Sequence, residues 1–222
     1  MNGSVVTRLV LKDLHLWRGL VIGALAAGGG SLAIMPITPV ASYVGGVAFV
    51  CVLVILNIVL VMNGVVQERK DKVQLFILSL PVSTTQYTTA KVIANVIAFT
   101  VPWAVLTAAA LTMIVVSAMP DGLLPFWTVL LAYLLGYYLV LLAVALATDS
   151  TGWHATIITV GNVSINLLIP LLLNLPSIGP QTRNAHAIWT ADVVGMVAGA
   201  LLVGAAALAL AICLRARRAD HV

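Results

Sequence analysis

The sequence predicts an all-α integral membrane protein, with six membrane-spanning helices forming a single transmembrane domain over residues 1–222. Its residues are 62% hydrophobic and only 8% charged, which leaves too little polar surface for a soluble domain. Apolar runs long enough to cross about 30 Å of hydrocarbon recur along the chain. These runs do not alternate apolar with polar residues, so they are helices and not barrel strands. The predicted spans are residues 20–35, 42–66, 89–118, 124–147, 155–173 and 191–214.

The placement of positive charge predicts the orientation of these spans. Ten of the eleven Lys and Arg residues fall in the N-terminal segment, in the loop at 67–91 or in the C-terminal tail, and only Arg183 lies on the other side. Cytoplasmic segments of membrane proteins carry such an excess of Lys and Arg. We therefore expect a multi-pass protein of the cytoplasmic (inner) membrane with both termini in the cytoplasm. Topology explains the basic composition, and no nucleic-acid partner is predicted.

The first 19 residues predict an amphipathic interfacial helix. At about 100° per residue, Arg8, Lys12 and His15 fall within about 60° of one another. The opposite face is apolar and contains Val6, Val10, Leu14 and Trp17. Such a helix lies among lipid headgroups, so membrane lipid is an expected partner. The alternatives are a solvated leader and a signal peptide, although the acidic residue and the tryptophan in the leader argue against cleavage.

The segment 67–88 is the one strongly charged interior stretch, and it predicts a cytoplasmic helix between the second and third spans. A charged run at residues 67–72 ends the second span. Four apolar residues then follow at positions i, i+3, i+4 and i+7 of one helical face, namely Val73, Phe76, Ile77 and Leu80. Pro81 ends this helix, and Ser83 with Gln86 forms a capping-box pattern that starts the third span near residue 84. The helix either docks a protein or rests on the bilayer.

Several kinds of chemistry are missing from the sequence. No Asp, Glu, Lys, Arg or His lies deep in a predicted span, whereas ion-coupled carriers keep ionisable groups there. The phosphate-binding pattern G-x-x-x-x-G-K-[ST] is absent, so a partner would have to hydrolyse ATP. Asp149, Ser150 and His154 lie close in sequence, but a polar turn with a helix cap accounts for them. We expect no enzymatic activity, no catalytic residue, no metal and no directly bound cofactor.

Neutral polar residues inside the spans are the candidates for a substrate path. Thr159, Asn162 and Asn166 share a sector of about 60° on the fifth span, at about 100° per residue. Asn57 and Asn63 lie on the second span. A buried amide without a hydrogen bond is costly, so these side chains should face other helices or a cavity. A path between the second and fifth spans and simple helix–helix hydrogen bonding both remain open.

The charged loop resembles the signature loop of type-2 ABC export permeases. In that family an acidic–basic pair leaves the second span, a coupling helix ends in Leu-Pro-Val-Ser, and a Lys follows. Here the pair is Glu68-Arg69, the ending is residues 80–83, and the Lys is Lys91. The six spans and the N-terminal helix are similar to the same family. The chain departs from it at Lys72-Val73 and Leu75, where the family often has Gly-Thr and then a Glu.

This resemblance implies the permease subunit of an ATP-driven exporter, working as a dimer with a second copy or a related permease. Two cytoplasmic ATPase subunits would bind the ATP and drive the cycle. Polar contacts to the ATPase would come from Glu68 and Arg69, and packing contacts from Val73, Phe76, Ile77 and Leu80. A haem-exporter permease is a narrower version, supported only by His186 and Trp189. A non-transporting membrane scaffold or assembly factor is the alternative class, and the substrate is not determined.

Overall fold

A computed structural model describes residues 3–67, 84–117, 119–148 and 150–219, and every regular element in these ranges is helical. Six of the helices are long and apolar enough to cross a membrane, which confirms the predicted all-α class and number of spans. The elements are α1 (Gly3–Ile34), α2 (Pro39–Val61), the π-helix η1 (Met62–Gln67), α5 (Thr84–Val116), α6 (Leu123–Ala147), α7 (Thr151–Asn174), the 3-10 helix η2 (Gly179–Arg183) and α8 (Ala191–Ala219).

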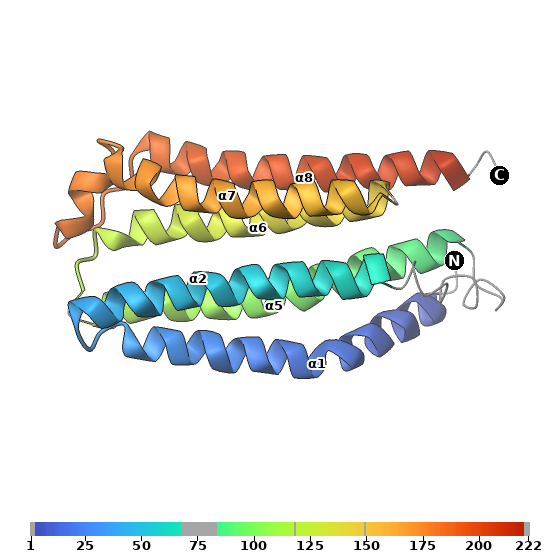
Figure 1. Cartoon of the computed structure of the whole chain (residues 1–222), viewed down its shortest axis with the longest axis horizontal. Coiled ribbons are helices and arrows are strands. Elements are labelled where there is room, and N and C mark those ends of the chain that lie inside the picture. The colour runs from blue at the N-terminus through green and yellow to red at the C-terminus, as the bar shows by residue number, and fades with distance from the viewer. Residues whose placement is uncertain (1–2, 68–83, 118, 149, 220–222) are drawn as a thin grey trace.

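The long helices run side by side along the bundle, with α1, α2 and α5 in one group and α6, α7 and α8 in the other (Figure 1). Both chain ends lie at one end of the bundle, which we call the terminal end. The turn after α1 and the segment that contains η2 lie at the opposite end. An even number of spans requires this arrangement. Which end faces the cytoplasm remains a prediction from the charge distribution.

The helix boundaries follow local signals in the sequence. Thr38 caps α2, because its Oγ1 accepts a hydrogen bond from the Ala41 N–H at 3.1 Å, and Pro39 occupies the first helical position. The helix α5 is described from Thr84 onward, and the residues before it lie outside the described residues, so the start predicted near residue 84 stays a prediction. Pro102 lies inside α5, which continues to Val116.

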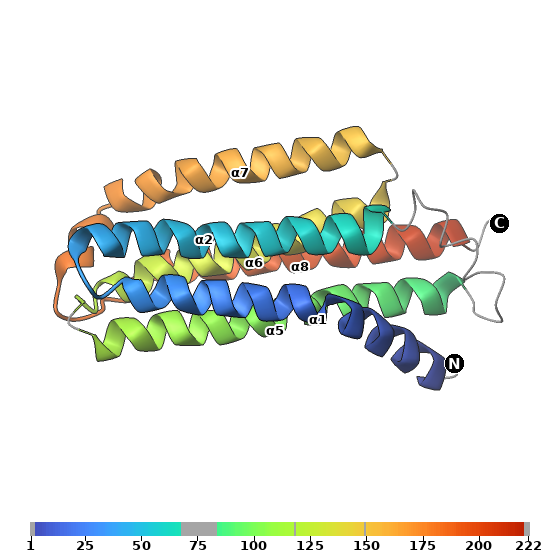
Figure 2. The ribbon, with the colours of Figure 1, turned by 60° about the horizontal axis from the view of Figure 1, so that its bottom comes forward.

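The beginning of the chain differs from the prediction of separate elements at 1–19 and 20–35. The helix α1 is continuous from Gly3 to Ile34, and it bends along its length (Figure 2). The glycines at 28–30 do not break it, because tertiary packing holds this part of the helix. A Cβ at Gly28 would lie 2.8 Å from the Leu106 side chain of α5, so glycine allows the two helices to approach closely here.

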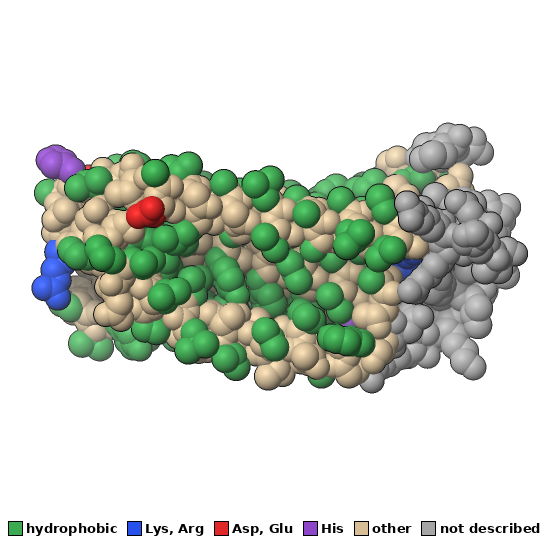
Figure 3. Space-filling model, turned by 90° about the horizontal axis from the view of Figure 1, so that it is seen from above, with side chains coloured by type: hydrophobic (Ala, Val, Ile, Leu, Met, Phe, Trp, Pro, Cys, Tyr) green, Lys and Arg blue, Asp and Glu red, His purple; other side chains and the backbone are tan. Residues whose placement is uncertain are grey.

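The core of the bundle is built around α6. The most apolar stretch of α6 is 78% buried, against 17% for α7 and 11% for α8. Aromatic contacts connect α6 to its neighbours, with Phe49 edge-on to Trp127 at 5.8 Å and Phe99 stacked on Tyr138 at 4.0 Å between ring centroids. Hydrophobic side chains spread along the outer surface, and charged side chains lie toward its ends (Figure 3). The outer faces of α7 and α8 therefore suit lipid or another protein.

Close packing between α6 and α8 depends on small residues. A Cβ at Gly136 would lie 2.5 Å from the backbone oxygen of Ala200, and one at Gly204 would lie 2.9 Å from the Gly136 Cα. Within a membrane, such small residues let helix backbones approach and gain van der Waals contact.

We predict that Gly136→Ala lowers the free energy of unfolding by about 1–3 kcal/mol, because the new methyl group must push α8 away from α6. Gly195→Ala is the matched control, since a Cβ at Gly195 meets nothing within 4 Å. Thermal unfolding of the detergent-solubilised protein, followed by size-exclusion chromatography, compares the two variants. Equal melting temperatures would contradict the packing described here.

Candidate functional site

The predicted coupling residues and their helix lie outside the described residues, and their role stays a prediction. These residues are Glu68, Arg69, Val73, Phe76, Ile77 and Leu80. The described chain does define the two points to which the loop is attached. The loop leaves the bundle after Gln67, at the end of η1, and the chain returns at Thr84, where α5 begins. Both points lie near the terminal end of the bundle (Figure 1).

A buried ion pair joins α1 to α5 beside the loop attachments. The Lys91 Nζ lies 2.7 Å from Oδ2 of Asp13, and the two side chains are only 7% and 4% exposed. Lys12 also approaches Asp13, at 3.7 Å from Oδ1, but its side chain is 53% exposed. Since burying a charge without a partner is very costly, Asp13 and Lys91 each depend on the other. The pair fixes the first half of α1 against the start of α5.

Aromatic side chains complete the surroundings of Lys91. Its Nζ lies 5.7 Å from the ring centroid of Trp17 and 6.0 Å from that of Tyr87, within cation–π range. The Trp17 ring in turn packs on Gly64 of η1, where a Cβ would lie only 2.7 Å from the ring. A larger residue at Gly64 would displace the indole. The first half of α1 therefore contacts both elements that carry the loop attachments, η1 through Trp17 and α5 through Asp13.

Hydrogen bonds extend this cluster to α6. The Tyr138 hydroxyl donates to the Asn95 carbonyl oxygen at 2.7 Å, and the Asn95 side-chain amide donates to the Lys91 carbonyl oxygen at 3.0 Å. Tyr138 also stacks on Phe99, one turn further along α5. The start of α5 is thus fixed to α6 on one side and to α1 on the other. We call Asp13, Trp17, Gly64, Lys91 and Asn95, with Tyr138, the base cluster.

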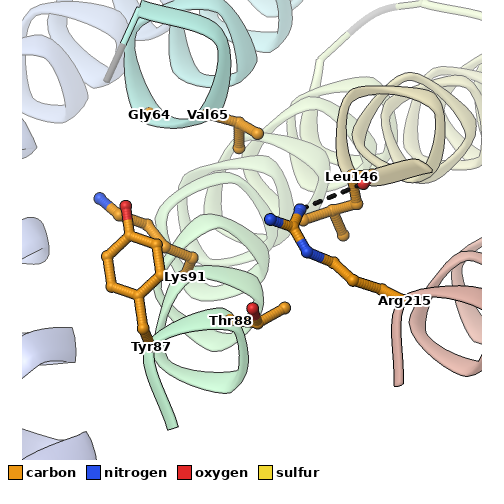
Figure 4. Close-up of a pocket in the computed structure, with 7 residues that line it drawn as sticks. All are labelled: Gly64, Val65, Tyr87, Thr88, Lys91, Leu146 and Arg215. Carbon is orange, nitrogen blue, oxygen red and sulfur yellow. Dashed lines mark hydrogen bonds between the residues drawn. The ribbon is translucent and has the colours of Figure 1, made fainter. Parts of the chain in front are cut away.

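A small cavity lies next to the base cluster (Figure 4). It is lined by Gly64, Val65, Tyr87, Thr88, Lys91, Leu146 and Arg215. Its open space is about 10 Å³, about the room that one water molecule needs. Arg215 of α8 donates a hydrogen bond from Nη1 to the Leu146 carbonyl oxygen at 3.1 Å, which ties α8 to α6. The cavity is far too small to bind a transported molecule.

The structure places the predicted path residues in different environments. Asn57 is completely buried, and neither of its amide atoms has a hydrogen-bond partner among the described residues. Asn63 is exposed on η1, and Asn162 is half-buried on α7. Thr159 and Asn166 are exposed on α7. Among the described residues α7 packs mainly on α6 and has little or no contact with α2 within one chain.

The two α7 asparagines donate within their own helix. The Asn162 amide donates to the Ile158 carbonyl oxygen at 2.9 Å, and the Asn166 amide donates to the Asn162 carbonyl oxygen at 2.8 Å. Tyrosines of α6 make the polar contacts to α7 instead, with Tyr133 hydrogen-bonded to Ser164. The exposed side of the α7 polar stripe consequently remains available for water or another protein.

Sequence reasoning missed the ion pair, although both partners carried a signal. Asp13 is the only acidic residue before Glu68, and Lys91 is the only charged residue between 84 and 116. Opposite charges on helices at the same end of a bundle are expected to form an ion pair, because a buried charge without a partner is so costly. Which helices are neighbours was the missing information.

Six apolar helices with both chain ends at one end of the bundle define a multi-pass membrane protein. The family model of ABC-2 family transporter proteins matches residues 35–190, which is well over half of the chain. The chain therefore belongs to the ABC-2 family of transporter proteins, as the loop resemblance indicated. The match extends from the turn before α2 to the segment before α8, and includes the loop and Lys91. No curated protein and no solved structure matches the chain.

We predict that Lys91→Met destabilises the protein by about 3–5 kcal/mol, because it removes the buried partner of Asp13 and leaves only the exposed and more distant Lys12 near the carboxylate. The double variant Asp13→Asn, Lys91→Met should recover most of this loss, since neither charge is then left alone. The control is Lys12→Met, an exposed neighbour expected to cost less than about 1 kcal/mol. Unfolding of each solubilised variant, followed by tryptophan fluorescence, measures the differences. A double variant as unstable as Lys91→Met would contradict the coupling of the two charges.

Proposed function

We propose that the chain is the membrane-spanning subunit of an ATP-driven export system, which moves a substrate across the cytoplasmic membrane when paired with a separate ATPase. The observation that carries this proposal is the family match over residues 35–190, which includes the loop with the permease-like signature. The sequence has no phosphate-binding loop, so ATP would be bound and hydrolysed by the partner. The positive-inside asymmetry supports cytoplasmic termini and a loop on the ATPase side.

The loop at 67–88 is the proposed docking site for the ATPase. The two elements that carry its attachments, η1 and α5, contribute Gly64 and Lys91 to the base cluster, which connects them with α1 and α6. Movement of the loop would therefore act on several helices at once. In this scheme ATP binding shifts the population between two arrangements of the bundle, because the ATPase holds the loop differently in each.

A dimer supplies the path in this proposal, either with a second copy or with a related permease. Thr159, Asn162 and Asn166 form a polar stripe on α7, and two of the three are exposed in the single chain. Polar groups in contact with lipid pay a desolvation cost, so the stripe favours an aqueous path shared with a partner chain. Asn57 supports a polar route inside the bundle, because its buried amide has no partner among the described residues.

We predict that an affinity pull-down of the gently solubilised chain recovers a soluble ATPase. Glu68→Ala with Phe76→Ala should lose that ATPase, since the change removes one polar and one apolar docking contact. Arg183→Ala is the control, as Arg183 is exposed in η2 at the opposite end of the bundle. A normally folded double variant that still retains the ATPase would refute the docking role of the loop. Absence of any ATPase from the native sample would count against the transporter assignment.

We predict that Asn166→Cys reacts faster with a water-soluble maleimide than Val160→Cys, measured in membranes after both native cysteines are changed to Ala. Both positions are exposed on α7, but they lie about 120° apart at about 100° per residue, and only Asn166 is on the polar stripe. Water in the path would reach the first site, and lipid would cover the second. Equal slow labelling at both positions would argue that the stripe faces lipid or packed protein.

A further inference from the structure

We propose that Asp13 and Lys91 are positioning residues that make the first half of α1 move together with the start of α5. Their ion pair would deliver a displacement of the loop at 67–88 to the N-terminal helix. This inference rests on the proposed function, because it requires an ATPase that moves the loop. It adds a transmission element that lies partly outside the matched family range, since Asp13 precedes residue 35.

Lys91 lies close to the point where the chain returns from the loop. Lys91 lies about two turns after Thr84, where the chain returns from the loop, at 3.6 residues per turn. A helix is stiff over that length, so a displacement of Thr84 would also move Lys91. The hydrogen bonds from Lys91 through Asn95 to Tyr138 keep this part of α5 in register with α6. Displacement of the α5 start is therefore passed to whatever Lys91 holds.

The contact between α1 and α5 at this point is a buried ion pair and not only apolar packing. The helix α1 packs on both α5 and α2, although only 22% of its most apolar stretch is buried in the bundle. Dispersion between apolar side chains has no fixed direction, and resistance to sliding comes only from how the side chains interlock. A buried ion pair cannot slide, because separating its charges in a low-dielectric environment is expensive. The 2.7 Å contact between Asp13 and Lys91 thus adds a charged restraint to the packing of α1 on α5.

A second contact, between α1 and η1, also supports coupling of the N-terminal helix to the loop. Trp17 of α1 rests on Gly64 of η1, which is the attachment at the other end of the loop. Asp13 and Trp17 are one helical turn apart, so one short segment of α1 touches both helices that carry the loop attachments, α5 and η1. The face with Arg8, Lys12 and His15 stays exposed on the other side of the helix. This segment is therefore placed to follow the loop while its charged face stays in contact with headgroups or water.

The test uses two thiol reporters in the complex of the full chain with its ATPase, after Cys51 and Cys213 are changed to Ala. His15→Cys, on the exposed face of α1, reports the N-terminal helix, and Thr89→Cys reports the start of α5. The rate of reaction with a water-soluble maleimide is measured with and without a non-hydrolysable ATP analogue. Each reporter is placed in the native background and in the control Lys12→Met. Each is also placed in two double variants: the uncharged pair (Asp13→Asn with Lys91→Met) and the charge reversal (Asp13→Lys with Lys91→Asp).

With the native pair and with Lys12→Met, we expect the ATP analogue to change the labelling rate several-fold at both reporters. The uncharged pair should keep the response on α5 and lose it on α1, and charge reversal should restore it. A purely structural role would not separate the two reporters in a complex that elutes normally and retains its ATPase. An α1 response that survives the uncharged pair would overturn this inference alone. Absence of a response on α5 in the native complex would overturn the proposed function, and the inference with it.

Discussion

The buried ion pair between Asp13 and Lys91 is the contact on which the terminal end of the bundle depends. Neither charge can remain in an apolar interior by itself, so the pair forces α1 and α5 together at one defined register. Trp17 and Tyr87 then pack around the ammonium group, and Gly64 makes room for the indole. Since η1 and α5 carry the two attachments of the charged loop, this one interaction connects the loop to the N-terminal helix.

The rest of the bundle is organised by an unequal distribution of burial. The helix α6 supplies the core, and α8 packs on it through glycines that bring the backbones together. In contrast, α7 and α8 leave broad apolar faces outside, and α7 adds a polar stripe to its exposed surface. Membrane helices gain little from hydrophobic association, so exposed faces of this kind are compatible with lipid. The polar stripe on α7 is less compatible with lipid, because its side chains would be better solvated by water or by polar groups of a protein partner.

Much of the candidate site could be predicted in outline but not in its contacts. The six spans followed from hydropathy, because hydropathy is a local signal. The start of α5 and the helix in the charged loop stay predictions from Pro and Ser positions and charge. The path candidates Asn57 and Asn166 could be named, yet the sequence could not tell that one is buried and the other exposed. Burial depends on which helices are neighbours, and hydropathy does not encode neighbours within an apolar bundle.

The sequence by itself determined the membrane class, the six spans and the family resemblance, since these depend on local composition and on one continuous loop motif. Only the tertiary structure decided that α1 is one bent helix and that α6 forms the core. It also decided that Asp13 pairs with Lys91, 78 positions further along the chain. The physical reason is that every span is apolar enough to cross a membrane, and apolarity does not tell which helices are neighbours. Their arrangement is set by close packing at glycines and by the need to pair a few buried charges.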